Sequence, residues 1–337
     1  MKNKRLILTI GVVIAVALIA TMVILLVKNT TPEEQGKDPD FLINSSIQES
    51  NLEISEFETE EQLDNSLPLY YIEDITNVSV VEEFIDTLGF EYERNKAVVE
   101  NHFTWGDEDT EAFFNYSTED NILDIMIRED IRSVVKLTRD NAETVVNSYL
   151  NSLGLEYEYK LNKMVPSGED TILYLSRMLE GYPIETPNTY GATDHLMFSE
   201  RGNLVYAQLL FAKFTNKLNY NVPLIDVDDL MKVINEEEYP KEIRVDDVDF
   251  IEGSENVETS YIEGEFSSEV VDIIDTVSDC NPMDISIVYY YPRQTGIYLL
   301  PAYKLNCVST ATYEETEYSI SSIVYTNAVS PEYISSE

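Results

Sequence analysis

The chain has 337 residues, with 63 Asp and Glu against 22 Lys and Arg, and a formal net charge of −41 at pH 7. A surface this acidic repels polyanions, which excludes nucleic acid as a partner and peripheral docking on anionic lipid. Hydrophobic residues make up 44% of the chain, which is enough to bury a sizeable core.

Residues 1–28 differ from the rest, because they contain four bases and no acid. Within them, Leu6–Val27 is an uncharged, mainly apolar run that is long enough to span a bilayer as one helix. The positive charges before this run predict a cytoplasmic N-terminus, with the remainder of the chain outside the cell. A cleaved signal peptide is the alternative, since Ala15-Val16-Ala17 has the small-x-small form, but cleavage there leaves Leu18–Val27 exposed.

The next segment, residues 29–66, holds eleven acids, one base and two prolines. This composition predicts either an extended acidic stalk or an unstructured linker. Leu52, Ile54 and Phe57 indicate one short strand within it.

Two similar helices are predicted in the remaining chain. Ser79 and Glu82 form a capping-box pattern before an apolar helical face that ends at Gly89. The same pattern returns from Asp140 to Gly154. The two segments share six identical positions out of thirteen, which indicates a duplicated unit. A third helix is expected from Asp226 to Glu236, without a terminal glycine.

Segments rich in Tyr, Phe, Ile and Val between these helices predict strands. The expected strands cover residues 113–116, 122–127, 156–161, 171–178, 195–198, 204–211, 284–291, 297–305 and 318–327. The sequence therefore predicts an α+β protein in which one transmembrane helix is followed by tandem helix-on-antiparallel-sheet units. The expected division is a cytoplasmic tail 1–5, a transmembrane helix 6–27, an acidic stalk 28–66 and three α+β units, 67–137, 138–220 and 221–337.

The chain has two cysteines, Cys280 and Cys307, and their midpoint falls in the expected hairpin turn between Arg293 and Gln294. Antiparallel pairing about this centre places the cysteines opposite each other, so outside the cytoplasm they are disulfide candidates. The alternative is two separate buried thiols.

Motifs for catalysis, cofactors or metals are not found. His102 and His195 are far apart in the sequence and have no neighbouring zinc ligands, and the chain lacks a phosphate-binding glycine loop and a nucleophile elbow. The acidic clusters lack the spacing of a calcium loop, although a weak, distributed association with calcium stays open. We therefore expect no catalytic residues, no cofactor and no metal ligands.

Tyr289, Tyr290 and Tyr291 are consecutive in an expected strand, so their side chains alternate between its two faces. Exposed tyrosines are typical of protein contact surfaces, which makes these residues partner-binding candidates. The alternative is a sheet that is covered on both sides.

Short motifs over residues 75–330 resemble the YycH/YycI group, membrane-anchored extracytoplasmic proteins of Gram-positive bacteria that associate with and restrain a cell-wall-regulating sensor histidine kinase. The motifs are Glu180-Gly181-Tyr182-Pro183-Ile184, the Gly202 hairpin, the 226–236 helix, Tyr289-Tyr290-Tyr291, Leu300-Pro301-Ala302-Tyr303 and Tyr325-Thr326-Asn327-Ala328. The resemblance implies propeptide-like helix-on-sheet domains without an active site. The acidic stalk, the cysteine pair and the charge depart from the group.

The expected function is that of a non-enzymatic, single-pass protein of the cell membrane whose extracellular part binds and modulates another envelope protein. From the resemblance, that partner is a sensor kinase of a two-component system. An anchored cell-envelope hydrolase, or a hydrolase-inhibitor-like domain, is the alternative. A passive surface protein with calcium-binding acids is a third reading.

Overall fold

The computed structural model describes residues 52–59, 63–73, 78–95, 101–107, 109–128, 137–155, 157–186, 189–216, 221–236, 239–244, 277, 279–292, 298–313 and 316–333. The expected single-pass arrangement is not found, since no helix within these ranges is long and apolar enough to cross a membrane. The run Leu6–Val27, on which that expectation rests, lies outside the described residues, as does most of the expected stalk.

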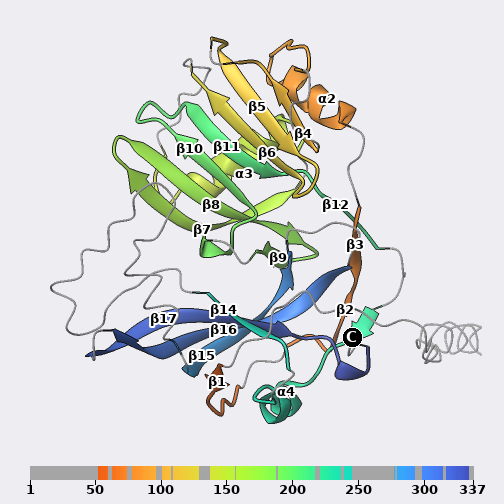
Figure 1. Ribbon diagram of the computed structural model, residues 1–337, viewed down its shortest axis with the longest axis vertical. Helices are drawn as coiled ribbons and strands as arrows, with labels where there is room; N and C mark the ends of the chain where they lie inside the picture. Colours follow the sequence, from red (N-terminus) through yellow and green to blue (C-terminus); the bar gives the residue numbers. More distant parts are fainter. Residues whose placement is uncertain are drawn as a thin grey trace, which may run out of the picture. The chain divides into compact units, whose positions relative to one another are not determined.

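Strands dominate the described residues (Figure 1). The strands are β1 (Glu53–Ile54), β2 (Ser66–Pro68), β3 (Tyr70–Glu73), β4 (His102–Trp105), β5 (Ala112–Ser117), β6 (Ile122–Ile127), β7 (Glu158–Ser167), β8 (Asp170–Leu179), β9 (Tyr182–Glu185), β10 (Asp194–Phe198), β11 (Leu204–Leu210), β12 (Lys213–Thr215), β13 (Asn221–Pro223), β14 (Lys241–Arg244), β15 (Asp279–Tyr290), β16 (Tyr298–Tyr313) and β17 (Thr316–Asn327). The helices are α2 (Ser79–Thr87), α3 (Ala142–Ser152) and α4 (Val227–Val233), with 3-10 turns η1 (Thr189–Gly191) and η2 (Pro331–Tyr333).

The prediction of tandem helix-on-antiparallel-sheet units is wrong, because these strands form one large mixed sheet. Its main path runs β12-β3-β16-β15-β9-β8-β10-β11-β6-β5-β4, and β2 and β13 form a separate pair. The short strand β9 joins the two halves of the path, since it pairs antiparallel with β8 and parallel with β15. Apolar periodicity reports which residues form a strand but not which strand lies beside it, so the sequence did not show this junction.

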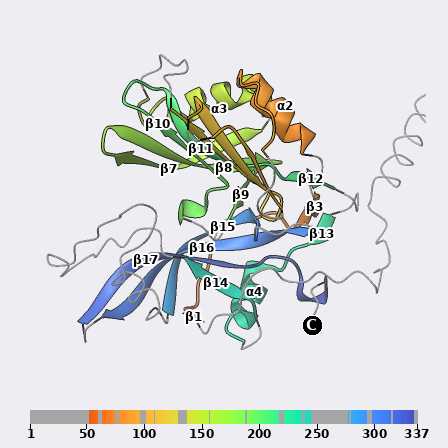
Figure 2. The same ribbon diagram turned by 45° about the horizontal axis from the view of Figure 1, so that its top comes forward.

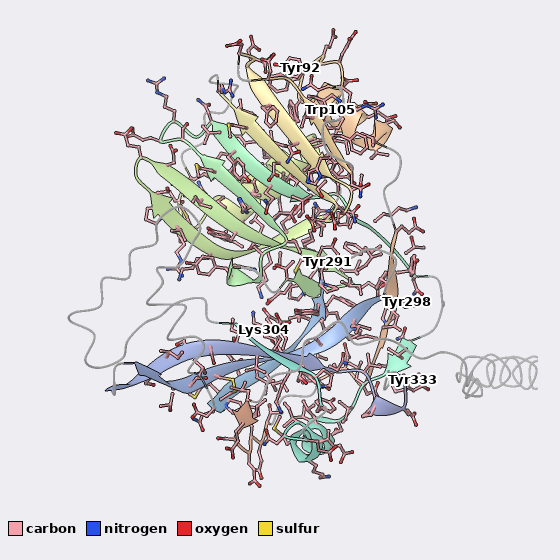
Figure 3. All side chains as sticks on the ribbon, viewed as in Figure 1. Tyr92, Trp105, Tyr291, Tyr298, Lys304 and Tyr333 are labelled. Carbon is pink, nitrogen blue, oxygen red and sulfur yellow. A yellow bond between two sulfur atoms is a disulfide. The ribbon has the colours of Figure 1, made fainter. Side chains whose placement is uncertain are left out.

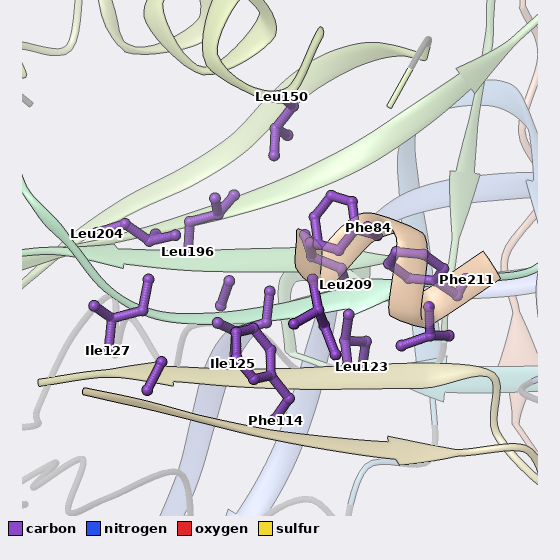
Figure 4. Packing of buried hydrophobic residues seen from close by; sticks show 14 of the residues in the cluster. Phe84, Phe114, Leu123, Ile125, Ile127, Leu150, Leu196, Leu204, Leu209 and Phe211 are labelled. Carbon is purple, nitrogen blue, oxygen red and sulfur yellow. The ribbon is translucent and has the colours of Figure 1, made fainter. Parts of the chain in front are cut away.

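The helices α2 and α3 pack on the same face of strands β5, β6, β10 and β11 (Figures 1 and 2). Their buried faces use the predicted spacing, with Phe84 from α2 and Leu150 from α3 in one core cluster. Figure 4 shows these two side chains with Leu123 and Leu209 from the sheet. Burial of such side chains contributes about 1.5 to 3 kcal/mol each.

The ends of the helices follow the sequence only in part. Gly89 and Gly154 follow α2 and α3 with φ of 90° and 81°, as their predicted stop positions require. Asp226 caps α4, because its side chain accepts a hydrogen bond from the backbone N–H of Asp228 at 2.9 Å. The predicted capping box of Ser79 is not formed, since α2 begins after Val78 without a side-chain cap.

The helix α3 also covers part of the outer edge of β7. The Asn147 side chain accepts a hydrogen bond from the N–H of Tyr159 and donates one to its carbonyl oxygen, both at 2.8 Å. The Glu143 carboxylate accepts one from the N–H of Leu161 at 2.9 Å. Side chains therefore satisfy backbone groups where a further strand would otherwise pair.

A second core cluster lies on one face of β15, β16 and β17. Leu230 of α4 and Ile54 of β1 pack there with Leu305 and Val324. The period-two alternation of strands then places Lys304 and Asn306 on the opposite face of β16, where they are partly exposed.

Candidate functional site: a lysine-lined groove

Cys280 and Cys307 form a disulfide, as predicted, but in a different register. Cys307 pairs with Pro282, so the two cysteines are diagonal neighbours instead of directly opposite. The reason is that the pair Tyr290 and Leu300 is centred on residue 295, the midpoint of 290 and 300, and not on 293.5. The register shift between Pro282 and Asp284 moves the centre back only to 294.5, the midpoint of Pro282 and Cys307.

Tyr289, Tyr290 and Tyr291 are at most 1% exposed, so the prediction that they form an exposed partner-binding surface is wrong. At these three residues the alternative, a sheet covered on both sides, holds. Tyr289 donates a hydrogen bond to the carbonyl oxygen of Pro68 at 2.9 Å, and Tyr291 donates one to that of Asp120 at 3.1 Å. These tyrosines tie β15 to distant parts of the chain.

A different site lies between β7 and the exposed face of β15, β16 and β17. It is a groove with a volume of about 480 Å³. Three lysines line it, Lys160 and Lys163 from β7 and Lys304 from β16, together with the carboxylate of Glu185. We call it the lysine groove. Figure 3 shows Lys304 on the side of β16 that faces β9.

The floor of the groove follows from strand alternation. Lys304, Asn306 and Val308 are every second residue of β16, and all three line the groove. The neighbouring strand β17 pairs Ile323 with Asn306 and Ser321 with Val308, and both of these residues also line it. The floor therefore changes from a basic end at Lys304 to a more apolar end near Val308.

The wall on the β7 side depends on an irregularity in that strand. Residues three apart in a regular strand lie on opposite faces, so Lys160 and Lys163 would point in opposite directions. The register of β7 against β8 shifts between Leu161 and Lys163, which is a β-bulge at Asn162. Asn162 is held by hydrogen bonds from its Nδ2 to Ser176 Oγ at 2.7 Å and to the carbonyl oxygen of Tyr190 at 2.8 Å. Both lysines then line the same groove.

Glu185 lies beside Lys304, at the same end of the groove. Its Oε1 accepts a hydrogen bond from Lys304 Nζ at 2.8 Å, and its Oε2 accepts one from the hydroxyl of Tyr325. The Glu185 side chain is 4% exposed and that of Lys304 is 18% exposed. Both carboxylate oxygens are therefore engaged within the protein.

The charge of the groove is opposite to that of the chain. Its lining holds three lysines and one glutamate, which gives 3 − 1 = +2, whereas the whole chain carries −41. Lys163 and Lys304 are half-buried, and partly buried charges are screened less by salt than exposed ones. The groove is thus suited to holding a carboxylate or another anion, and its amide and hydroxyl groups are suited to hydrogen bonding.

The remaining candidates in the sequence are the two histidines and the acidic clusters. Within the residues that the structure describes, no group of three or more His, Cys, Asp or Glu is placed to hold a metal ion. His195 packs against the rings of Tyr174 and Tyr206. Much of the acidic sequence, including Asp246, Asp247 and Asp249, lies outside the described residues.

The groove could not be predicted from the sequence, because its residues come from segments that are far apart in the chain, β7, β9 and β15–β17. One signal was present in the sequence. Lys160 lies in the expected strand 156–161 and Lys163 lies two residues beyond its end, so two of the only 22 bases of the chain occur within four residues.

Comparisons with known proteins place the chain in no family. No protein-family model matches it, and no curated protein matches it. The solved structures that are similar include an uncharacterized protein from Eubacterium rectale, at 8% identity and a TM-score of 0.45, covering 83% of this chain and 88% of that one. Another is the C-terminal domain of Bacillus megaterium YpeB, at 10% identity and a TM-score of 0.30, covering 74% and 99%. Likeness at this level carries no conclusion about this chain, and the YycH/YycI resemblance receives no support from the comparisons.

Proposed function

We propose that this protein is a non-enzymatic protein that acts outside the cytoplasm by binding a segment of another protein in the lysine groove. The observation that carries the proposal is the charge contrast. A chain of net charge −41 concentrates three of its 22 bases in the lining of one groove. Opposite charge on a partner speeds its association and selects against wrong partners.

The disulfide supports a location outside the cytoplasm, because bonds of this kind persist in oxidising compartments. A sensor histidine kinase of the cell envelope is the partner that the sequence resemblance suggests. We therefore include the extracytoplasmic part of such a kinase among the partners to be tested.

Binding is favoured over catalysis by the state of Glu185, the carboxylate in the groove. A general base must reach the proton that it abstracts from the substrate. Both oxygens of Glu185 already accept hydrogen bonds, from Lys304 and Tyr325. This arrangement holds Lys304 in place instead of offering a reactive carboxylate.

Site-specific crosslinking in intact cells tests the proposal. A photoreactive residue at Ser321, which is exposed and lines the groove, is expected to capture a partner protein. The same residue at Glu83, which is exposed on α2, is the control for non-specific capture.

The capture must also depend on the charge of the groove. Replacing Lys160 and Lys163 by Gln is expected to abolish the crosslink from Ser321. The matched control replaces Lys213 and Lys232, whose side chains are 69% exposed and which do not line the groove. A crosslink that survives the first pair of substitutions contradicts the proposal.

Steady turnover of peptidoglycan or peptides by the purified protein would instead support the hydrolase alternative. The groove variant Lys160→Gln with Lys163→Gln separates the two readings. Turnover that is lost in this variant, with the fold retained, would make the groove an active site and overturn the proposal.

A further inference from the structure

We infer that the lysine groove recognises an extended polypeptide segment that presents a carboxylate and, about two to four residues away, an apolar side chain. The inference rests on the proposed function, because it specifies what the groove binds. The inference depends on a second feature of the groove besides its charge, which is an apolar end.

Met283 marks this apolar end. Its side chain is 68% exposed, the largest value among the exposed large hydrophobic residues of the described chain, and it lines the groove. Val308 lies at this end, and Ile323, which pairs with Asn306, lies next to it on β17. Exposed methionines are common on surfaces that bind apolar side chains, because the unbranched thioether adapts to different shapes.

The exposure of Met283 has a structural cause. The register of β15 against β16 shifts between Pro282 and Asp284, so Met283 is the extra residue of a β-bulge. The neighbouring residues are fixed, since Asp284 pairs with Asn306 and Cys307 is bonded to Cys280. The bulge therefore presents Met283 from a rigid part of the sheet.

The distance between the two ends sets the spacing of the ligand. A strand rises about 3.4 Å per residue, so Asn306 lies about 7 Å and Val308 about 14 Å along β16 from Lys304. An extended peptide has the same rise. A carboxylate near Lys304 and an apolar side chain near Met283 are then about two to four residues apart in the ligand.

Three further groups favour a polypeptide and decide which end of the groove holds its acid. The amide of Asn306 lies on the floor between the ends and the hydroxyl of Ser321 lies opposite Val308, and both can hydrogen-bond a peptide backbone. Asp284 lies next to the apolar end, where its carboxylate accepts a hydrogen bond from Asn306. A like charge there repels an acidic side chain, whereas the Glu185 carboxylate at the Lys304 end already accepts hydrogen bonds from Lys304 and Tyr325, so the acid of the ligand belongs at the Lys304 end.

Fluorescence anisotropy with synthetic peptides on the full-length protein tests the inference. The probe peptide repeats the pattern Glu-Ser-Leu-Ser, so that glutamate and leucine alternate at every second position and serine fills the positions between them. Two comparison peptides replace either all leucines by serine or all glutamates by glutamine. The probe is expected to bind at least about tenfold more tightly than each comparison peptide, and citrate, a free carboxylate, is expected not to displace it.

Variants of the protein locate the two contacts. Met283→Ser is expected to weaken binding of the probe peptide about tenfold. Binding of the acidic peptide in which serine replaces the leucines is expected to be unchanged. Its control, Met126→Ser, changes a residue that is 45% exposed on β6 and does not line the groove. The double variant Lys160→Gln with Lys163→Gln is expected to weaken the binding of every acidic peptide. The control double variant Lys213→Gln with Lys232→Gln is expected to bind these peptides as the wild-type protein does.

The outcomes separate this inference from the proposed function. Equal binding of the probe and the acidic peptide without leucine overturns the inference but leaves a groove that binds acidic protein segments. Failure of the probe to bind, or its displacement by citrate, also overturns the inference. The crosslinking from Ser321 then decides separately whether the groove binds a protein at all.

Discussion

Arg177 forms a bidentate ion pair with Asp194 in the interior of the sheet. Its Nε lies 2.9 Å from Oδ2 and its Nη2 lies 2.7 Å from Oδ1, and both residues are at most 1% exposed. Burial lowers the pKa of Arg177, but the Asp194 carboxylate outweighs this effect and raises the pKa above its ordinary value. Arg177 also lies over the ring of Tyr157, at 4.6 Å. The ion pair thus holds the charged Arg177 guanidinium inside the fold.

Loss of one partner of this pair is expected to be severe. Arg177→Met leaves the Asp194 carboxylate buried and unpaired, which lowers the free energy of unfolding by about 3 to 5 kcal/mol. Denaturant unfolding measures the loss. The double variant Arg177→Met with Asp194→Leu is expected to recover only part of it, because Asp194 also accepts the N–H of Leu210 at 2.9 Å. Complete recovery would show that this N–H needs no partner.

The disulfide is expected to stabilise the fold. Cys280 and Cys307 are 27 residues apart, and closing a loop of this length in the unfolded chain corresponds to about 3 to 4 kcal/mol in the chain-entropy estimate. Replacing both cysteines by Ala is expected to lower the denaturation midpoint accordingly. Reductant must lower the denaturation midpoint of the wild-type protein by the same amount and leave that of the double variant unchanged. A lower midpoint of the double variant in reductant would contradict this account.

Tyr303 makes the fold sensitive to alkaline pH. Burial, assisted by the nearby charge of Asp226, raises the pKa of Tyr303 to about 12. The unfolded chain ionises this hydroxyl near its ordinary pKa of about 10, so the unfolded state loses the proton first. The stabilisation is therefore fully present below pH 10 and is lost as the pH rises toward 12. Unfolding followed against pH measures this decline.

A phenylalanine variant isolates the contribution of Tyr303. Its hydroxyl donates a hydrogen bond to the carbonyl oxygen of Ile225 at 2.6 Å. Tyr303→Phe is expected to cost about 1 kcal/mol at neutral pH and to flatten the alkaline decline. Tyr333→Phe, at a half-buried tyrosine in η2, is the control and should change neither quantity. An unchanged decline in Tyr303→Phe would assign the alkaline sensitivity to other tyrosines.

Two glycines with similar backbones predict different costs on substitution by alanine. Gly106 and Gly168 have φ of 73° and 63°, where an L-residue costs about 1 to 2 kcal/mol. A Cβ on Gly168 meets nothing nearby, whereas one on Gly106 overlaps the carbonyl oxygen of Ala112. Gly106→Ala is therefore expected to lower the melting temperature by clearly more than Gly168→Ala. Equal decreases in melting temperature would mean that the backbone of β5 at Ala112 moves aside without cost.

Local patterns predicted the elements well because they depend on neighbouring residues. The strand expected over Ile122–Ile127 is β6 with the same bounds, and α2 and α3 begin within three residues of their predicted starts. The sequence did not show the pairing of β9 with both β8 and β15, because pairing depends on residues that are far apart in the chain.

Burial of the tyrosine run could not be predicted for a related reason. Tyr289 and Tyr291 lie in one core cluster and Tyr290 in another, on the other face of β15. The residues that cover them, such as Ile184 and Tyr325, come from other segments. The lysine groove escaped prediction because its wall depends on the bulge at Asn162, which no sequence period reveals.

The capping of β7 by Asn147 and Glu143 bears on the behaviour of the protein in concentrated solution. An exposed strand edge is a template for pairing with a second molecule, which leads to aggregation. Along Tyr159 and Leu161, a side-chain amide and a carboxylate take the place of that second molecule. Helix α3 thereby blocks the pairing of this edge of β7 with a strand of another molecule, and so opposes the formation of fibrous aggregates.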